Sequence, residues 1–172
     1  MAKVLCFCFG IFLAFSPQAT LKKAVRTGEI VRLHVVAAGD SAEEQRVKLC
    51  VRDAVLDAFG ARMKAAKTKE EALNAISGNL SEIERTAKAA AEAEDYFGPV
   101  RAIMGVYAFP DREYEGVLVP RGDYQALRIV LGEGEGQNWW CLLYPSLCLA
   151  ASSAEPAEET RWCFFDIFKA WF

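Results

Sequence analysis

Hydrophobic and polar residues alternate along residues 29–38, which read EIVRLHVVAA and are rich in β-branched side chains. This period of two predicts a β-strand. A Gly-Asp turn then ends the strand, and Ser41 with Glu44 has the spacing of a capping box, which begins a helix. One face of that helix is apolar, and Gly60 is expected to end it. The apolar face is formed by Val47, Val51, Ala54, Val55 and Ala58.

Two further helices are predicted after residue 67. Thr68 with Glu71, and Ser81 with Glu84, repeat the spacing of a helix start, and a Gly-Asn pair separates the two segments. The second segment carries a stripe of small apolar residues, which lets another element approach it closely.

From residue 98 onward the pattern returns to that of strands. Strands are predicted over residues 100–109, roughly 115–119, 124–131 and 138–144, and their short connections favour antiparallel neighbours. The chain therefore predicts an α+β fold, with one N-terminal strand, two or three helices, and then a mostly antiparallel meander of about four strands. The helices are expected to cover one face of the sheet.

The two ends of the chain differ from the middle. An apolar run of about a dozen residues follows Lys3, which is too short to span a bilayer but is typical of a signal peptide. We predict that residues 1–19 are a signal peptide, with an uncleaved membrane anchor as the alternative, and that the protein is exported. Residues 150–160 read as a polar linker, and residues 161–172 as an aromatic segment that docks on the domain or makes peripheral membrane contact.

Composition restricts the class of protein. A chain of 172 residues is enough for one domain, which we place at residues 29–149. The formal net charge is -3 and the basic residues are scattered, so the sequence argues against a nucleic-acid partner.

Export gives the cysteines a second interpretation. Seven residues of strand separate Cys141 from Cys148 by roughly 23 Å, so a disulfide between them requires the chain to reverse near Pro145. Small buried cysteines in the core are the alternative. The cysteines outside the signal segment are Cys50, Cys141, Cys148 and Cys163, an even number that permits disulfides.

The glycine-rich segment 132–136 (GEGEG) does not fit a phosphate-binding loop. Such a loop precedes a helix N-terminus, whereas this segment precedes a predicted strand. Glu133 and Glu135 would also repel a phosphate. We predict a hairpin loop between two strands.

Candidate chemistry is sparse. The single histidine, His34, lies inside a predicted strand, where a structural role is the simpler interpretation. A pair with Cys141 or Cys148 would instead indicate a secreted thiol-dependent hydrolase. One histidine and a C-x6-C spacing match no zinc pattern, and we predict no metal, no cofactor and no enzymatic activity. Trp139 and Trp140 are expected to point to opposite faces of their strand, and large aromatics are frequent binding anchors.

The segment GEGEGQNWWCLLYPSLC, preceded by PRGDYQALRIVLG, closely resembles the C-terminal signature of the stage II sporulation protein R family. VRLHVVAAGDSAEEQRVKLCVRDAVLDAF resembles the opening strand and helix of that family, and FGPVRAIMGVYAFPDREYEGVLVP fits the region between. The resemblance covers roughly residues 30–149 and also includes the N-terminal export segment. Gly39 stands where the family has asparagine, and Ser146 where a second proline is common.

The resemblance implies a signalling protein made in the forespore and exported into the space between the forespore and mother-cell membranes. It is expected to activate a membrane-embedded aspartic protease, directly or through an intermediate, and this protease cleaves the sigma-E precursor. A structural, membrane-associated protein is the third hypothesis. The motif core implied by the resemblance, which either holds the fold or contacts the partner, comprises Asp40, Arg52, Asp53, Gln137, Asn138, Trp139 and Trp140.

Overall fold

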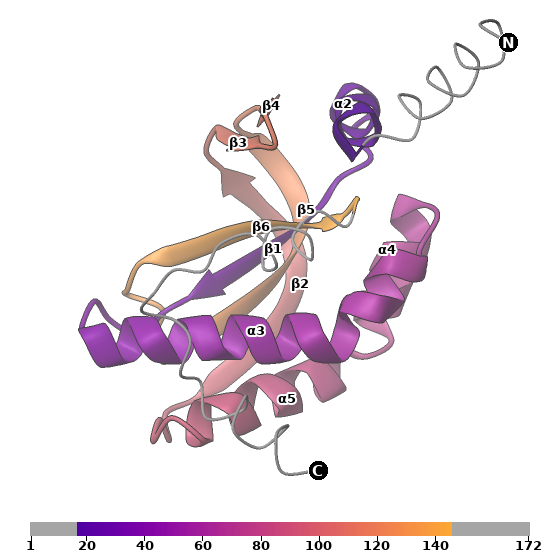
Figure 1. Cartoon of the computed structure of the whole chain (residues 1–172). Helices are drawn as coiled ribbons and strands as arrows, with labels where there is room; N and C mark the ends of the chain where they lie inside the picture. Colours follow the sequence, from indigo (N-terminus) through magenta and orange to yellow (C-terminus); the bar gives the residue numbers. More distant parts are fainter. Residues whose placement is uncertain (1–16, 146–172) are drawn as a thin grey trace, which may run out of the picture.

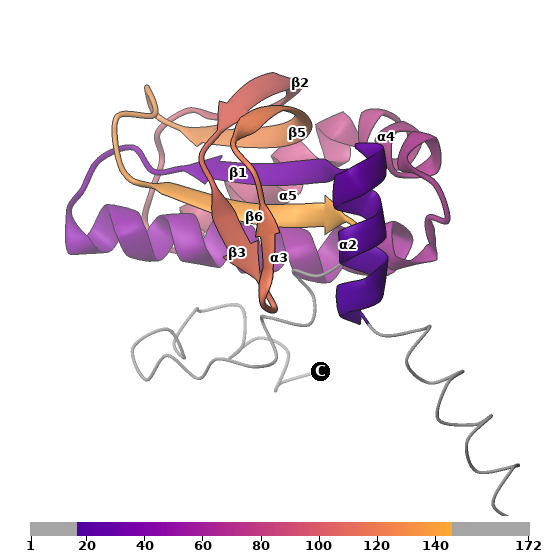
Figure 2. The ribbon, with the colours of Figure 1, turned by 90° about the horizontal axis from the view of Figure 1, so that it is seen from above.

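The computed structural model describes residues 17–145, which fold around a four-stranded sheet in the order β2-β5-β1-β6. Helices α3, α4 and α5 lie on one side of this sheet, and helix α2 and the small sheet β3-β4 lie on the other (Figures 1 and 2). The elements are α2 (Pro17–Thr27), β1 (Val31–Val36), α3 (Ala42–Ala65), α4 (Lys69–Ser77), α5 (Leu80–Glu92), β2 (Val100–Phe109), β3 (Arg112–Tyr114), β4 (Val117–Val119), β5 (Gly122–Leu131) and β6 (Asn138–Tyr144).

The predicted α+β class is confirmed, and the strand order adds a feature that the sequence did not indicate. Strand β1 lies between β5 and β6, parallel to β5 and antiparallel to β6. Of the strands predicted to form the meander, only β2 and β5 are antiparallel neighbours in the main sheet. The first strand of the chain thus interrupts the expected meander and becomes a central strand, which explains why all six of its residues are buried.

The glycine-rich loop after β5 therefore does not form a hairpin between neighbouring strands, and that prediction was wrong. It crosses the end of β1 to reach β6, and Gly136 N donates a hydrogen bond to Ala37 O at 3.0 Å. A Cβ atom at Gly136 would lie 2.1 Å from Gly39 O, so only glycine fits there. The backbone of the loop therefore packs closely against the end of β1.

Helix α3 begins at the predicted capping box, in which Glu44 N donates to Ser41 Oγ and the Glu44 carboxylate accepts from Ser41 N. It does not end at Gly60 as predicted but continues to Ala65. Gly60 and Met63 are both buried, so packing against the core holds the last turn despite the weak helix propensity of glycine.

Helix α4 starts at Thr68 as predicted, since Glu71 N donates to Thr68 Oγ1 at 3.1 Å. Helix α5 starts two residues earlier than predicted, with Asn79 and not Ser81 at its N-cap, and Ser81 lies inside it. Glu84 does not close a capping box. Its carboxylate accepts a hydrogen bond from Ala102 N of β2 at 2.9 Å, and so ties α5 to the edge of the sheet.

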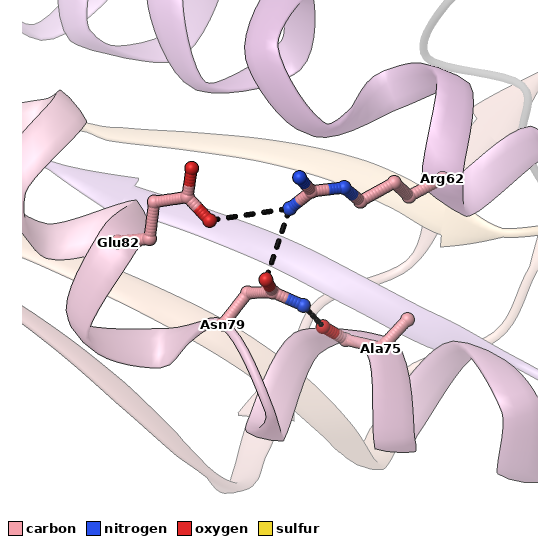
Figure 3. Close-up of polar contacts among 4 residues, drawn as sticks. All are labelled: Arg62, Ala75, Asn79 and Glu82. Carbon is pink, nitrogen blue, oxygen red and sulfur yellow. Dashed lines mark hydrogen bonds and ion pairs between the residues drawn. The ribbon is translucent and has the colours of Figure 1, made fainter.

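Asn79 also joins the three helices, as Figure 3 shows. Its Nδ2 donates to Ala75 O of α4 at 2.7 Å, and its Oδ1 accepts from Arg62 Nη1 of α3 at 2.9 Å. The same Arg62 nitrogen donates to Glu82 of α5 at 3.2 Å. These contacts are largely exposed, so they position the α4–α5 junction more than they stabilise it.

The side of the sheet away from α3 carries a second, smaller core. Its buried members come from α2, from the segment before β1, from β4 and from β6, and they are Leu21, Ala24, Ile30, Val117, Val119 and Leu142. The sequence reading missed α2, whose first residues fall in the predicted signal peptide. Residues 1–16, the predicted linker at 150–160 and the aromatic segment at 161–172 lie outside the described residues.

The strand expected at roughly residues 115–119 is a short hairpin. Strands β3 and β4 pair in antiparallel fashion, and Glu115 and Gly116 form the turn with φ values of 52° and 75°. Within residues 17–145, no helix is both long and apolar enough to cross a membrane.

Candidate functional site

One row of side chains crosses the sheet on the face away from α3. Ile103 of β2 pairs with Arg128 of β5, Arg128 pairs with His34 of β1, and His34 pairs with Trp140 of β6. Residues directly opposite one another share a face, and successive residues of a strand alternate between faces. Leu33 and Trp139, their neighbours in sequence, accordingly pack into the helix-side core. We call the face that carries this row the open face.

His34 is the most constrained member of the row. Its Nε2 donates to Asn138 Oδ1 at 2.6 Å, and its ring stacks on Trp140 with a centroid distance of 3.9 Å and an interplanar angle of 18°. Burial lowers the pKa of His34 to about 4, an effect opposed by Asn138 and reinforced by Arg128 and Arg32. The imidazole is therefore neutral near pH 7, and Nδ1 is buried without a hydrogen-bond partner.

This geometry speaks against a catalytic pair of His34 with Cys141. Cys141 belongs to the helix-side core, whereas His34 lies on the open face, so the two side chains point to opposite sides of the sheet. The Cys141 sulfur is also held in a disulfide bond and is not a nucleophile in this state. Cys148, the other candidate thiol, lies outside the described residues.

Arg32 adjoins the row and is fully buried, with an exposed fraction of 0%. Its guanidinium lies 4.1 Å from the centroid of the Phe109 ring and 5.2 Å from that of Tyr124, and Nη2 donates to Tyr114 Oη at 2.8 Å. Within residues 17–145, Nε and Nη1 of Arg32 have no hydrogen-bond partner, and Arg32 takes part in no ion pair. Burial lowers the pKa of Arg32, and the aromatic rings stabilise the charge in place of a carboxylate.

The remaining motif residues lie near the helix side. The Arg52 guanidinium lies 4.3 Å from the Trp139 ring centroid and also makes a two-pronged ion pair with Asp53 at 2.7 and 2.9 Å. Trp139 and Trp140 thus point to opposite faces, as predicted, and each has a partner within the fold. Trp139 Nε1 is buried without a hydrogen-bond partner.

Asp40 and Gln137, which are 97 residues apart in the chain, meet at the end of β1. Asp40 Oδ1 accepts a hydrogen bond from Gln137 N at 2.8 Å, and the buried Lys48 donates to Gln137 O at 3.3 Å. The side chains of Asp40 and Lys48 therefore fix the start of β6. This accounts structurally for Asp40 of the Gly-Asp turn, whereas residue 137 takes part through its backbone N and O.

The structure thus brings the motif residues together in two groups. Asn138 and Trp140 join His34 on the open face, while Arg52, Asp53 and Trp139 lie on the helix side, with Asp40 and Gln137 at the edge between them. Sequence reasoning missed the arginines of the open face. Their signal was a single arginine inside each of two mostly apolar runs, Arg32 in VRLHVV and Arg128 in ALRIVL, which is unusual in a buried sheet.

Cys50 and Cys141 are both disulfide-bonded and both buried. The predicted pairing of Cys141 with Cys148 stays a prediction, because Cys148 and Cys163 fall outside residues 17–145. In the same described part of the chain, no group of three or more metal-ligating side chains comes together.

Comparison with known proteins identifies the family. Residues 27–154 match the model of the family described as stage II sporulation protein R. The chain belongs to this family. It is 33% identical to stage II sporulation protein R of Bacillus subtilis (strain 168), over 92% of this chain and 77% of that protein. No solved structure matches the chain. The protein is therefore a sporulation protein of the stage II R family.

Proposed function

We propose that this protein is an exported forespore signal that activates the membrane-embedded aspartic protease of the mother cell, which processes the sigma-E precursor. Membership of the stage II sporulation protein R family carries the proposal. The protein acts in the space between the forespore and mother-cell membranes, and its role is that of a ligand and not of an enzyme.

The state of the cysteines supports export. Both cysteines within the described residues are disulfide-bonded, and disulfides persist in oxidising compartments outside the cytoplasm. An export segment at residues 1–19 accounts for how the chain would reach such a compartment.

The chemistry of the open face supports a non-enzymatic role. A histidine that serves as a general base needs a pKa near the working pH and access to the substrate. His34 has a pKa of about 4 and is only 6% exposed, and its Nε2 is already engaged with Asn138. These features favour a structural histidine over the thiol-dependent hydrolase hypothesis.

The test is reconstitution in a host that does not form spores. The chain is co-expressed with the cognate membrane protease and the sigma-E precursor, with and without residues 1–19, and cleavage of the precursor is followed by immunoblot. We expect cleavage only when both the full chain and its protease are present. Secretion of the chain is verified separately in each strain.

Two results would contradict the proposal. One is absence of cleavage although the chain is secreted and folded. The other is full cleavage by the version without residues 1–19 while it stays in the cytoplasm, because a ligand of the intermembrane space has to be exported.

A further inference from the structure

The outer part of the open face carries two cations that have no acidic partner among the described residues. Arg101 and Ile103 follow one another on the open face of β2, and Arg128 stands beside Ile103 on β5. Neither Arg101 nor Arg128 takes part in any of the ion pairs of residues 17–145, and Arg128 Nε is buried without a hydrogen-bond partner. A charged donor that is shielded from water and unpaired favours a ligand that supplies an acceptor.

Tyr107 shapes the same surface. A Cβ atom at Gly105 would lie 2.9 Å from Tyr107 Oη, so the tyrosine side chain occupies the space that the glycine leaves. The Arg128 guanidinium lies 5.4 Å from the centroid of that ring. The aromatic ring holds the guanidinium toward β2 without neutralising its charge. Arg101, Ile103, Tyr107 and Arg128 together form what we call the β2 patch.

The β2 patch borders a free edge of the sheet. Strand β2 is the first strand of the order β2-β5-β1-β6, and within residues 17–145 it pairs only with β5. Ala102 N points away from β5, because it donates to the Glu84 carboxylate of α5. By the alternation of a strand, the N–H groups of Met104 and Val106 point the same way. Val106 is 62% exposed and Ile103 is 41% exposed, so this edge presents both backbone donors and apolar side chains.

An edge strand with exposed apolar residues is a template for pairing with another chain. Glu84 blocks the part of the edge nearest α5. Within residues 17–145, the N–H groups of Met104 and Val106 donate no comparable hydrogen bond. The unpaired arginines determine the chemistry of the chain that fits, because like charges are excluded and carboxylates are attracted.

We propose that the free edge of β2 binds an extended acidic segment of the protein partner. The segment adds as a strand against Met104 and Val106, covers Ile103 with an apolar side chain, and places carboxylates at Arg101 and Arg128. This inference rests on the proposed function, since the partner is the protease that the chain activates. It follows a recurrent mode of peptide recognition, in which backbone pairing gives affinity and side chains give specificity.

The test uses the reconstituted cleavage assay with three variants of the full chain. Arg101→Glu reverses an exposed charge in the β2 patch, and Val106→Pro removes an outward N–H that does not pair with β5. Arg85→Glu is the matched control, because Arg85 is an exposed arginine on α5 without an ion pair in the described residues. We expect about tenfold slower cleavage for the first two variants and a change within about twofold for Arg85→Glu.

Direct contact is measured by photo-crosslinking. A photoreactive residue at Ile103 is expected to cross-link to the protease, whereas one at Leu118, which is 58% exposed on the β3-β4 hairpin, is not. Circular dichroism and secretion levels establish that every variant is folded. An inactive wild-type chain would count against the proposed function itself, and the assay of the variants is read only when the wild type is active.

With an active wild type, two outcomes overturn the inference. The first is cleavage at the wild-type rate by both folded variants, Arg101→Glu and Val106→Pro. The second is binding of the wild type to vesicles of anionic phospholipid that Arg101→Glu abolishes, together with no cross-link from Ile103 to the protease. The latter result would assign the β2 patch to a membrane surface.

Discussion

His34 and Trp140 stack face to face across β1 and β6, with their ring centroids 3.9 Å apart. Phe109 covers both rings edge-on, at centroid distances of 5.9 and 4.8 Å. The histidine is thereby enclosed by aromatic side chains, and its one hydrogen-bond partner in the described residues is Asn138. His34 and Phe109 are buried in this layer, and Trp140 of the family signature lies half-buried against them.

This enclosure predicts that stability falls with pH below about 6.5. Because the pKa of His34 is lowered to about 4 in the folded state, the unfolded chain binds a proton between these values and the folded chain does not. The stabilisation that comes from the neutral His34 is fully present above about pH 6.5. It is lost as the pH falls to about 4, which lowers the free energy of unfolding by at most about 3 kcal/mol. Urea denaturation at a series of pH values measures it.

His34→Gln is the control for this pH dependence. The variant should lose the part of the pH dependence that belongs to the histidine, while the contribution of surface carboxylates at lower pH stays. Identical pH profiles for the wild type and His34→Gln would show that His34 is protonated equally in both states.

The close approach of Gly136 to Gly39 O predicts a strong effect of a single methyl group. In Gly136→Ala the new Cβ would lie 2.1 Å from a backbone oxygen, which cannot rotate away, so the loop after β5 has to shift. We expect the free energy of unfolding to drop by about 2–3 kcal/mol. Chemical denaturation followed by tryptophan fluorescence measures the change.

Gly122→Ala is the matched substitution, because its Cβ would make an ordinary contact of 3.6 Å with Tyr124. It should change the free energy of unfolding by less than about 0.5 kcal/mol. Equal effects of the two substitutions would contradict the packing argument for Gly136.

Arg32 depends on Tyr114 for its side-chain hydrogen bond. Removing the hydroxyl in Tyr114→Phe leaves a fully buried guanidinium with aromatic faces alone, and we expect a loss of about 1–3 kcal/mol in the free energy of unfolding. Tyr124→Phe keeps the ring beside Arg32 and removes a hydroxyl that donates to Pro120 O near the surface. It should cost less than about 1 kcal/mol. The reverse order of the two effects, in thermal or urea unfolding, would show that Arg32 is not held by Tyr114.

The disulfide state of Cys141 gives a covalent prediction. We expect a bond to Cys148, since a reversal of the chain after Tyr144 is all that the spacing requires. Mass spectrometry of peptides from the secreted, unreduced protein should recover the two residues in one cross-linked peptide, and Cys148→Ser should release one thiol at Cys141. Recovery of Cys141 linked to Cys50 would refute this pairing.

Much of the secondary structure was predictable because it depends on local chemistry. The capping residues Ser41 and Thr68 begin α3 and α4 as expected, since each satisfies a free N–H within its own first turn. Strands β2 and β6 have the predicted bounds. Each is a run of mainly apolar and aromatic residues bounded by Gly and Pro residues, which the sequence shows directly. The opposite orientation of Trp139 and Trp140 follows from the alternation of side chains along a strand.

The errors arose where distant parts of the chain meet. Gly60 does not end α3, because burial of the following turn outweighs the propensity of one residue. Glu84 accepts a hydrogen bond from the backbone of β2 instead of capping a helix, and Asn79 takes the N-cap position expected for Ser81 and links α5 to α3 and α4. Helix α2 went unrecognised because the partners of its buried residues lie in β4 and β6.

The sequence by itself determined the α+β class, most element starts and, through its signature strings, the family. The tertiary structure decided that β1 enters between β5 and β6, which places Arg32 and His34 in the middle of the sheet and leaves β2 at its edge. Local patterns report burial and capping within a few residues. The order of strands depends on contacts between segments far apart in the chain, and so do the buried arginine, the neutral histidine and the free edge that follow from it.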